Sequence, residues 1–358
     1  MGKKTIWQKL FSSESLTFGI VAIAYAIVAA LVYTGNASSQ LKNVLISLSC
    51  YIVMALSLNL VVGLLGELSL GHAGFLSVGA FTGCMVSIAL ADLLPLPLRL
   101  PLGMIIGGLC AALVGLVVGL PALRLKGDYL AIVTLGCGEI IKNVITNLDI
   151  PGTTLHGALG LDTKGIYSSA KTLLPYAIIL VLITLLVMMN FKRSKHGRAI
   201  MAIRDNRIAA EATGINVTYY KLLVFVLAAF FAGMAGTLYG HAFSQLKADT
   251  FNLNMSIEVL VIVVFGGMGS LGGSIVATII LRALQEFLRG FSTYRMLVYS
   301  ILLILIMILN ENKRFQTFKS RFSLSYQWSS FRAFIRKRAA KKNAQKAELN
   351  GKEEENRE

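Results

Sequence analysis

Two pairs of ionisable side chains stand in otherwise apolar stretches, where a charged group needs a reason to be present. Glu67 and His72 open the glycine-rich stretch 66–90, and Glu139 and Lys142 lie three residues apart in a later apolar run. A carboxylate near an imidazole could relay protons, because ionisable residues inside membranes are often functional. A glycine break also frees backbone groups that a histidine can bond, and we favour this structural role. Glu139 and Lys142 have the spacing of a pair on one helix face.

No pattern for bond chemistry accompanies these residues. The cysteines at positions 50, 84, 110 and 137 are scattered through apolar segments without a C-x-x-C pair, and we interpret them as buried apolar residues. The phosphate-binding pattern G-x-x-x-x-G-K-[ST] does not occur in the sequence. We therefore expect no enzymatic activity and no cofactor in this chain. If transport here uses ATP, another polypeptide binds the ATP and Mg²⁺.

The composition is that of an all-α polytopic membrane protein. Hydrophobic residues make up 55% of the 358 and charged residues 15%, whereas a soluble domain carries about 25% charged residues. Long apolar runs separate clumped charges, and the short alternating segments of a membrane barrel are absent. The net charge of +16 comes from cations beside the apolar runs and in the tail. Membrane topology explains them, so we expect no nucleic-acid partner.

The apolar runs predict about eight full transmembrane helices plus a glycine-broken pair of short helices. The predicted full crossings are residues 18–32, 41–65, 66–90, 102–120, 129–147, 173–189, 222–243 and 296–309. Prolines 95, 97 and 101 are expected to form a turn before the fourth of these.

Both termini are expected in the cytoplasm. Residues 1–16 form the N-terminal segment, residues 17–309 the transmembrane domain, and residues 310–358 a basic tail. A cleaved signal peptide is the alternative for the first run, but the many spans that follow favour an uncleaved helix. The tail mixes cations with aromatic residues, which suits an anionic membrane surface, and a solvated tail is the alternative.

Two glycine-rich segments differ from the other runs. Residues 66–90 hold five glycines, which predicts a broken or tightly packed span. Residues 266–273, GGMGSLGG, hold five glycines in eight, which predicts two short helices, within 256–288, joined by a break and returning to the outer face. Ser-Leu-Gly occurs at 69–71 and again at 270–272. Paired broken helices point to a substrate route, and close helix packing is the alternative. The substrate-path candidates are Ser69, Gly71, His72, Gly74, Gly266, Gly267, Gly269, Ser270 and Gly272.

A polar, basic loop occupies residues 191–221, between two apolar runs. Its first half contains the cations Lys192, Arg193, Lys195, Arg198, Arg204 and Arg207. Charge alone could fix topology, but residues 198–213 also predict a short helix that Gly214 closes, with Asn216 beginning the next helix. A topology signal does not need that architecture. We therefore interpret the loop as a cytoplasmic helix that docks on a partner.

The chain resembles the branched-chain amino-acid permeases, which are membrane subunits of ABC importers, and in particular their M-type subunit. The blocks that carry the resemblance follow the family's order: residues 66–75 (GELSLGHAGF) with 79–80, 123–136 (LRLKGDYLAIVTLG), selected positions of 197–236, and 266–273. Arg207 departs from the pattern, since relatives usually carry an acid there. The Glu-Ala-Ala, three residues, Gly pattern of ABC permeases is only approximated by residues 209–214.

The resemblance implies a permease that translocates branched-chain amino acids across the bacterial cytoplasmic membrane. It implies ABC ATPase subunits, a second homologous permease and an extracytoplasmic substrate-binding protein as partners, besides membrane lipid. The loop 191–221 then couples to the ATPase, with Arg204 and Glu211 pairing with its surface. An exposed charged helix face is the alternative. The coupling candidates are Gly197, Arg198, Arg204, Asp205, Asn206, Ala210, Glu211 and Gly214.

Alternatives remain at two levels. Within the ABC architecture, urea or another amino acid is a rival substrate. In a different class, an ion-coupled secondary transporter would explain broken helices and buried acids without a coupling loop. A membrane receptor has no use for a docking helix.

Overall fold

The computed structural model describes residues 13–33, 39–125, 127–149, 155, 157–166, 168–288, 301 and 304. Residues 1–12 of the predicted N-terminal segment 1–16, most of the predicted crossing 296–309 and the tail 310–358 therefore lie outside the described residues. The fold below concerns the compact unit Glu14–Arg289.

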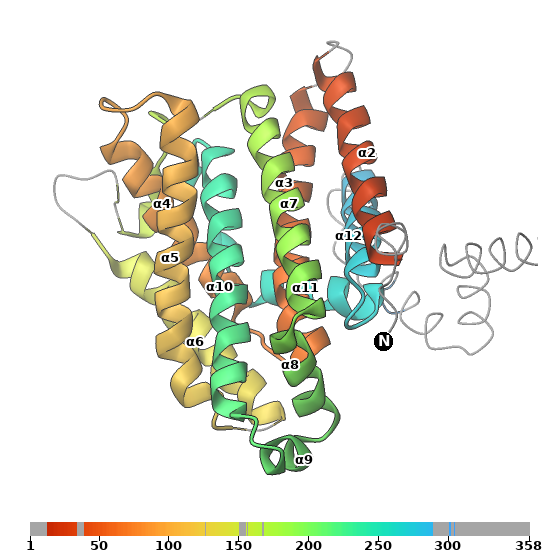
Figure 1. Ribbon diagram of the computed structural model, residues 1–358. Coiled ribbons are helices and arrows are strands. Elements are labelled where there is room, and N and C mark those ends of the chain that lie inside the picture. Colours follow the sequence, from red (N-terminus) through yellow and green to blue (C-terminus); the bar gives the residue numbers. More distant parts are fainter. Residues whose placement is uncertain are drawn as a thin grey trace, which may run out of the picture. The chain divides into compact units, whose positions relative to one another are not determined.

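Helices account for nearly all of this unit (Figure 1). The long helices are α2 (Ser13–Tyr33), α3 (Ser39–Asn59) continued by the π-helical turn η1 (Leu60–Leu65), α4 (His72–Ala89), α5 (Leu96–Ala122), α6 (Asp128–Asn147), α7 (Ala170–Arg193) and α10 (Val217–His241). The shorter helices are α8 (Lys195–Asp205), α9 (Arg207–Ala212), α11 (Leu253–Gly266) and α12 (Leu271–Phe287). The remaining elements are η2 (Gly157–Leu159), β1 (Leu161–Asp162), β2 (Gln245–Leu246) and η3 (Ala248–Thr250).

The predicted all-α polytopic membrane fold is confirmed. Among the described residues, seven helices are long and apolar enough to cross a membrane, and they cover 41–65, 72–89, 96–122, 128–147, 171–193, 217–241 and 248–266. The turn expected at prolines 95–101 places the start of the following helix too late in the chain. Helix α5 already begins at Leu96, with Pro97 in its first turn. Proline is tolerated at this position because the first N–H groups of a helix have no hydrogen-bond partner within the helix, so the N–H that proline lacks is not needed.

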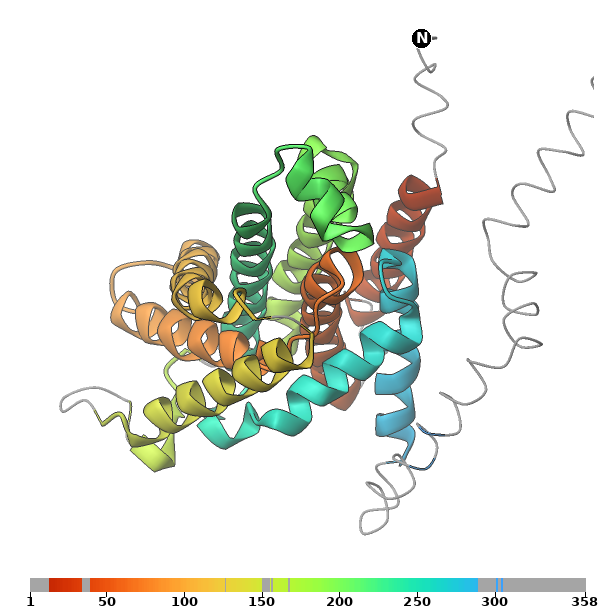
Figure 2. The same ribbon diagram turned by 90° about the horizontal axis from the view of Figure 1, so that it is seen from below.

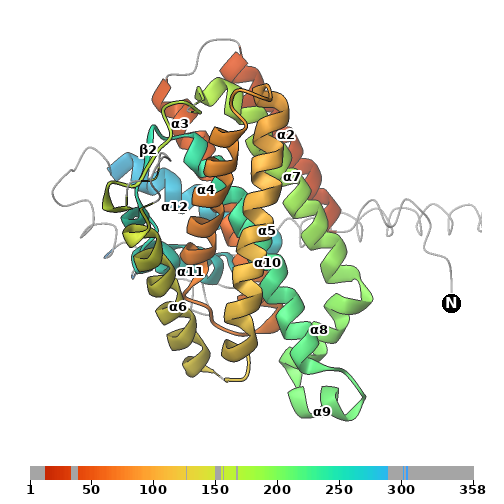
Figure 3. The ribbon, with the colours of Figure 1, turned by 90° about the vertical axis from the view of Figure 1, so that its left-hand side faces the viewer.

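Close packing of glycines holds the core of the bundle together. Helix α10 lies along α4 and α5, as Figures 1 and 3 both show. At their crossing, a Cβ added to Gly79 of α4 would overlap the backbone of Gly233 in α10. Close backbone approach of this kind drives helix association in membranes, where the hydrophobic effect between helices is absent. The glycine-rich stretch 66–90 is thus both interrupted, at 66–71, and tightly packed from His72 onward.

Helix α10 extends from one end of the bundle to the other. Its 25 residues extend about 37 Å at 1.5 Å per residue, enough to cross a bilayer core of about 30 Å. One end, here called the α8 end, carries α8 and α9 just before α10 begins (Figures 1 and 3), and Figure 2 looks onto it. The other, the strand end, carries the antiparallel pair of β1 and β2, in which Leu161 lies opposite Leu246.

The predicted glycine break is confirmed between α11 and α12. Helix α11 ends at Gly266, and Gly267 and Gly269 have φ values of 91° and 81°, which side chains with a Cβ rarely adopt. Helix α12 then runs back along α3, because Ser274 lies by Asn59 and Arg282 lies by Ser47. The pair therefore returns to the strand end.

Candidate functional site

The basic loop forms two helices rather than the single helix predicted over 198–213. Asn206 interrupts it with an extended backbone, φ −155° and ψ 104°, and its side chain accepts a hydrogen bond from Ala209 N at 3.1 Å. Asparagine is a strong N-cap residue, so it ends α8 and begins α9. The start was predicted too late, since α8 begins at Lys195 with Ser194 as its N-cap. The later boundaries are confirmed: Gly214 is left-handed at φ 84°, and the Asn216 side chain caps α10 through Tyr219 N.

Side chains on α8 and α9 divide into a packed face and an exposed face. Ile200 and Ile203 are buried against the bundle, as is Ala210. On the outer side Ile208 is 80% exposed. Arg207 and Glu211 form an ion pair of 2.9 Å along α9.

The coupling candidates fall on both faces. Gly197 is buried, and a Cβ there would overlap the carbonyls of Phe191 and Lys192, so it shapes the loop as Ala210 does. Arg198, Asp205, Asn206, Glu211 and Gly214 are exposed. Arg198 donates to the Arg193 carbonyl at 3.0 Å. The exposed residues could meet another protein, and Ile208, which the sequence reading overlooked, lies among them.

Arg204 is exposed in part, but its guanidinium is used within the chain. Nη1 donates to the Gly63 carbonyl at 3.0 Å, and Nε and Nη2 donate to Asp205 Oδ1 at 3.2 and 3.1 Å. Its stem lies against Gly66, where a Cβ would come within 2.7 Å of Arg204 Cγ. Helix α8 is thereby attached to the end of the π-helical turn.

A second cation of the loop contacts the glycine break. Lys192 Nζ donates to the Gly269 carbonyl at 2.8 Å. Asn59, just before η1, accepts from Gly269 N at 2.8 Å and donates to Ser270 O at 3.1 Å and Ser274 Oγ at 2.7 Å. We call this meeting of η1, residues 266–270 and the side chains of Lys192 and Arg204 the glycine junction.

The substrate-path candidates near the start of α4 are packed among helices. A Cβ on Gly71 would overlap the Thr134 carbonyl of α6, and Gly74 lies against Gly138. Ser69 and His72 are buried, and His72 Nε2 bonds Ser57 Oγ at 2.7 Å. The histidine thus bonds a side chain, not the freed backbone groups that we expected.

Of the candidates in the second segment, Gly266, Gly267, Gly269 and Ser270 belong to the glycine junction, and Gly272 lies in the first turn of α12. The cavity beside Gly74 and Ser256 measures about 10 Å³, the size of one water, and none of the second set lines it. A substrate role for either set stays a prediction.

The ionisable residues singled out from the sequence are paired. Glu139 and Lys142 form the expected i, i+3 pair at 2.5 Å. Glu67 does not meet His72; it forms an ion pair with Lys221 at the start of α10. Burial raises the pKa of the Glu67 carboxyl, and the Lys221 ammonium opposes that rise.

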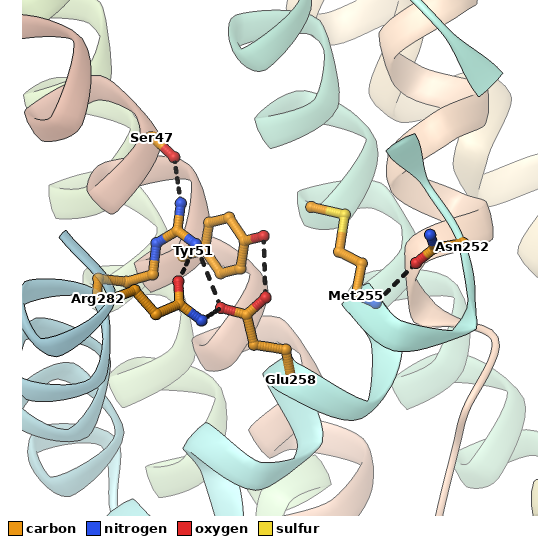
Figure 4. A network of polar contacts seen from close by, with 7 residues as sticks. Ser47, Tyr51, Asn252, Met255, Glu258 and Arg282 are labelled. Carbon is orange, nitrogen blue, oxygen red and sulfur yellow. Dashed lines mark hydrogen bonds and ion pairs between the residues drawn. The ribbon is translucent and has the colours of Figure 1, made fainter. Parts of the chain in front are cut away.

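One charged network escaped the sequence reading. Figure 4 shows the Arg282 guanidinium of α12 between Ser47 of α3 and Glu258 of α11, against the Tyr51 ring. Its members lie on three helices and are separated by up to 235 residues in the chain. A sequence signal existed in the acid and the arginine themselves, each within an apolar run.

Comparison with known proteins places these features in a family. Residues 40–309 match the family described as "Branched-chain amino acid transport system / permease component". The high-affinity branched-chain amino acid transport system permease protein LivM of Salmonella typhimurium is 35% identical over 333 residues, covering 85% of this chain and 74% of that protein. The protein of the same name from Escherichia coli K12 is 37% identical over 287 residues, covering 72% and 66%.

A more distant relative carries a different name. The ribose import permease protein RbsC of Haemophilus influenzae is 25% identical over 316 residues, covering 84% of this chain and 94% of that protein. No solved structure matches the chain.

Proposed function

Because this chain belongs to the family of branched-chain amino acid transport permease components, we propose that it is the membrane subunit of an ABC importer for leucine, isoleucine and valine. It performs no bond chemistry. ATP and Mg²⁺ are bound by separate ATPase subunits, and the chain lies in the bacterial cytoplasmic membrane as a multi-pass protein.

The α8 end faces the cytoplasm in this proposal, and both termini lie on the same side. The support is the distribution of cations, which flank the spans at that end in accordance with the positive-inside bias. The described cations there are Arg124, Lys192, Arg193, Lys195, Arg198, Arg204, Arg207 and Lys221. The strand end then faces outward, toward an extracytoplasmic substrate-binding protein.

One observation carries the coupling role: α8 and α9 expose Ile208 and Glu211 outward while Arg204 and Lys192 attach the loop to the glycine junction. A partner that moves the loop therefore also moves the backbone of η1, through the bond from Arg204, and of the glycine break, through the bond from Lys192. ATPase subunits, which change their separation as ATP binds and leaves, are a partner that could use such a link. A second, homologous permease completes the path.

Branched-chain amino acids are the proposed substrates because both LivM relatives carry that substrate in their names. Urea and other amino acids are the rivals within the same architecture. The ribose permease match, at lower identity, supports the importer architecture without supporting a sugar substrate.

Reconstitution tests this function against ion-coupled transport. The complex, with its ATPase subunits, second permease and binding protein, is placed in proteoliposomes. Uptake of radiolabelled leucine that requires ATP and the binding protein is the expected result. Uptake driven by a proton or sodium gradient alone would contradict the proposal.

Two variants test the docking surface. Glu211→Arg reverses a charge on the exposed face, and Gly214→Pro replaces a left-handed glycine that proline cannot mimic. Both proteins should insert in the membrane and fail to co-purify with the ATPase. Normal co-purification of both would remove the docking role from this loop.

A further inference from the structure

The charged network of Figure 4 lies between the two arms of the broken helix pair. Glu258 belongs to α11 and Arg282 to α12, and the glycine break joins these helices. We propose that Glu258 and Arg282, with Tyr51, form a transient binding site for a free amino-acid zwitterion. This inference rests on the proposed function.

The hydrogen bonds of the network match the two charged groups of a zwitterion. Arg282 Nη1 donates to Glu258 Oε1 at 3.2 Å and to Gln285 Oε1 at 2.7 Å, and Nη2 donates to Ser47 Oγ at 2.6 Å. A guanidinium is the strongest partner for a carboxylate. Glu258 in turn supplies the negative charge that an ammonium group requires. Binding a zwitterion leaves the net charge of the site unchanged.

The direct contact between Arg282 and Glu258 is a single hydrogen bond of 3.2 Å, and Glu258 Oε1 also accepts a bond of 2.7 Å from Gln285 Nε2. Arg282 reaches a single oxygen of Glu258, without the two parallel bonds of an arginine–carboxylate fork. The other oxygen, Oε2, accepts a long bond of 3.4 Å from the Tyr51 hydroxyl. The side chains of Arg282 and Glu258 remain 20% and 18% exposed. Charges inside a membrane are expensive, and well-packed apolar residues would stabilise helices at least as well.

A cavity near the strand end adjoins this network at Ser47. This cavity of about 420 Å³ is lined by Asn43 and Ser47 of α3 and by residues 242–244, directly after α10. Its volume lies within the range of small-molecule sites. Ser47 both lines this cavity and accepts the Arg282 hydrogen bond, so the cavity adjoins the network.

The glycine break gives the site a means of opening. Because Glu258 and Arg282 lie on opposite arms, a change of angle at Gly267 and Gly269 alters their separation. When the two side chains move apart, Arg282 can bind the carboxylate of a substrate and Glu258 can bind its ammonium group. The glycine junction connects that change to the loop 191–221 through Lys192, at the end of α7, so substrate binding and the loop act on the same hinge.

The test compares variants in the reconstituted complex. Glu258→Gln and Arg282→Gln are near in size to the native residues, and Arg282→Lys keeps the charge. Glu139→Gln and Lys142→Gln are the matched controls, because they break another ion pair within a membrane helix. The measurements are assembly, ATP hydrolysis, and leucine imported per ATP hydrolysed.

We expect Glu258→Gln and Arg282→Gln to assemble and hydrolyse ATP while leucine imported per ATP falls at least about tenfold. The controls should stay within about twofold of the unmodified complex. An unchanged ratio in both neutral variants would overturn the inference. So would loss of assembly in Glu258→Gln together with Arg282→Lys, because the network would then be structural.

The unmodified complex separates this inference from the proposed function. If it imports another zwitterionic amino acid but not leucine, the proposed substrate fails and the ratio is measured with that amino acid. If it imports only an uncharged solute, both fail.

Discussion

Arg204 Nη1 donates a 3.0 Å hydrogen bond to the carbonyl of Gly63, which belongs to the last turn of the π-helical segment η1. Carbonyls in a helix's last turn have no partner within the helix, so this acceptor is available. Residues 141 positions apart are thereby joined. The bond attaches the loop 191–221 to the end of a membrane span whose other contacts lead to the glycine break.

Replacing this arginine should uncouple ATP hydrolysis from transport. Arg204→Ala removes the bond to Gly63 and leaves α8 folded, because Ile200 and Ile203 still pack. We expect normal ATPase association and at least about tenfold less leucine imported per ATP, since one hydrogen bond from a charged group contributes about 1.5–3 kcal/mol. Lys164→Ala, which breaks an exposed pair with Asp162 near the strand end, serves as the control. Equal coupling ratios for the two variants would contradict a transmitting role for Arg204.

An exposed isoleucine should anchor the ATPase. Ile208→Asp places a charge where a partner's apolar pocket is expected, and co-purification of the ATPase should fall at least about tenfold. The fold should not change, because this side chain contacts little of its own chain. Leu159→Asp, a similarly exposed apolar residue near the strand end, should leave association intact. Binding that survives in Ile208→Asp would place the ATPase contact elsewhere.

The membrane fold could be read from the sequence because its signals are local. Apolar runs of sufficient length predict spans, and glycine clustering at 266–273 predicts a break, since glycine disfavours a helix interior. At Asn206 the prediction from local sequence was wrong. Within a run of good helix formers it read as helix interior, and its extended backbone shows the residue acting as a cap instead.

Contacts between distant segments could not be read in this way. Arg204 and Lys192 bond backbone carbonyls, which every residue possesses, so no residue type marks their acceptors. Glu258 and Arg282 meet only because α12 folds back along α3 and α11. The glycine break was predicted, but the side chains that the returning helix brings together depend on its rotation about its own axis.

Glycine packing between α4 and α10 should tolerate no added side chain. Gly79→Ala forces a methyl group into the backbone of Gly233, and overpacking of this kind costs about 1–3 kcal/mol. Gly136→Ala in α6 is the matched control, because a Cβ there meets nothing within 4 Å, and its effect should be neutral or stabilising. Thermal unfolding in detergent, followed by size-exclusion chromatography, measures both. Equal midpoints would show that α4 and α10 can separate freely.

Removing one charge of the buried pair Glu67 and Lys221 should destabilise the protein, whereas removing both charges should be tolerated. Their side chains are 14% and 4% exposed, so Glu67→Gln alone leaves a buried ammonium without its counter-charge. Such a change destabilises by about 3–5 kcal/mol. The double variant Glu67→Gln with Lys221→Met removes both charges and should recover most of the loss in the same unfolding measurement. A double variant as unstable as the sum of the single ones would show that the two residues act independently.

Asn59 should be the most sensitive position of the glycine junction. Its amide donates to Ser270 O and Ser274 Oγ, and its oxygen accepts from Gly269 N. Asn59→Leu keeps the volume but leaves the partly buried Gly269 N–H without its acceptor, at about 1–3 kcal/mol, whereas Ser274 Oγ and Ser270 O keep the hydrogen bond between them. Asn59→Asp keeps the acceptor for Gly269 N and loses both donated bonds. If the junction transmits motion, Asn59→Asp should lower leucine uptake per ATP, and Asn59→Leu should lower it further. ATPase association should persist in both variants. Asn143→Leu, on an exposed face of α6, is the control for an asparagine lost from a span. Full coupling in Asn59→Leu would mean that α8 acts on the membrane helices by another contact.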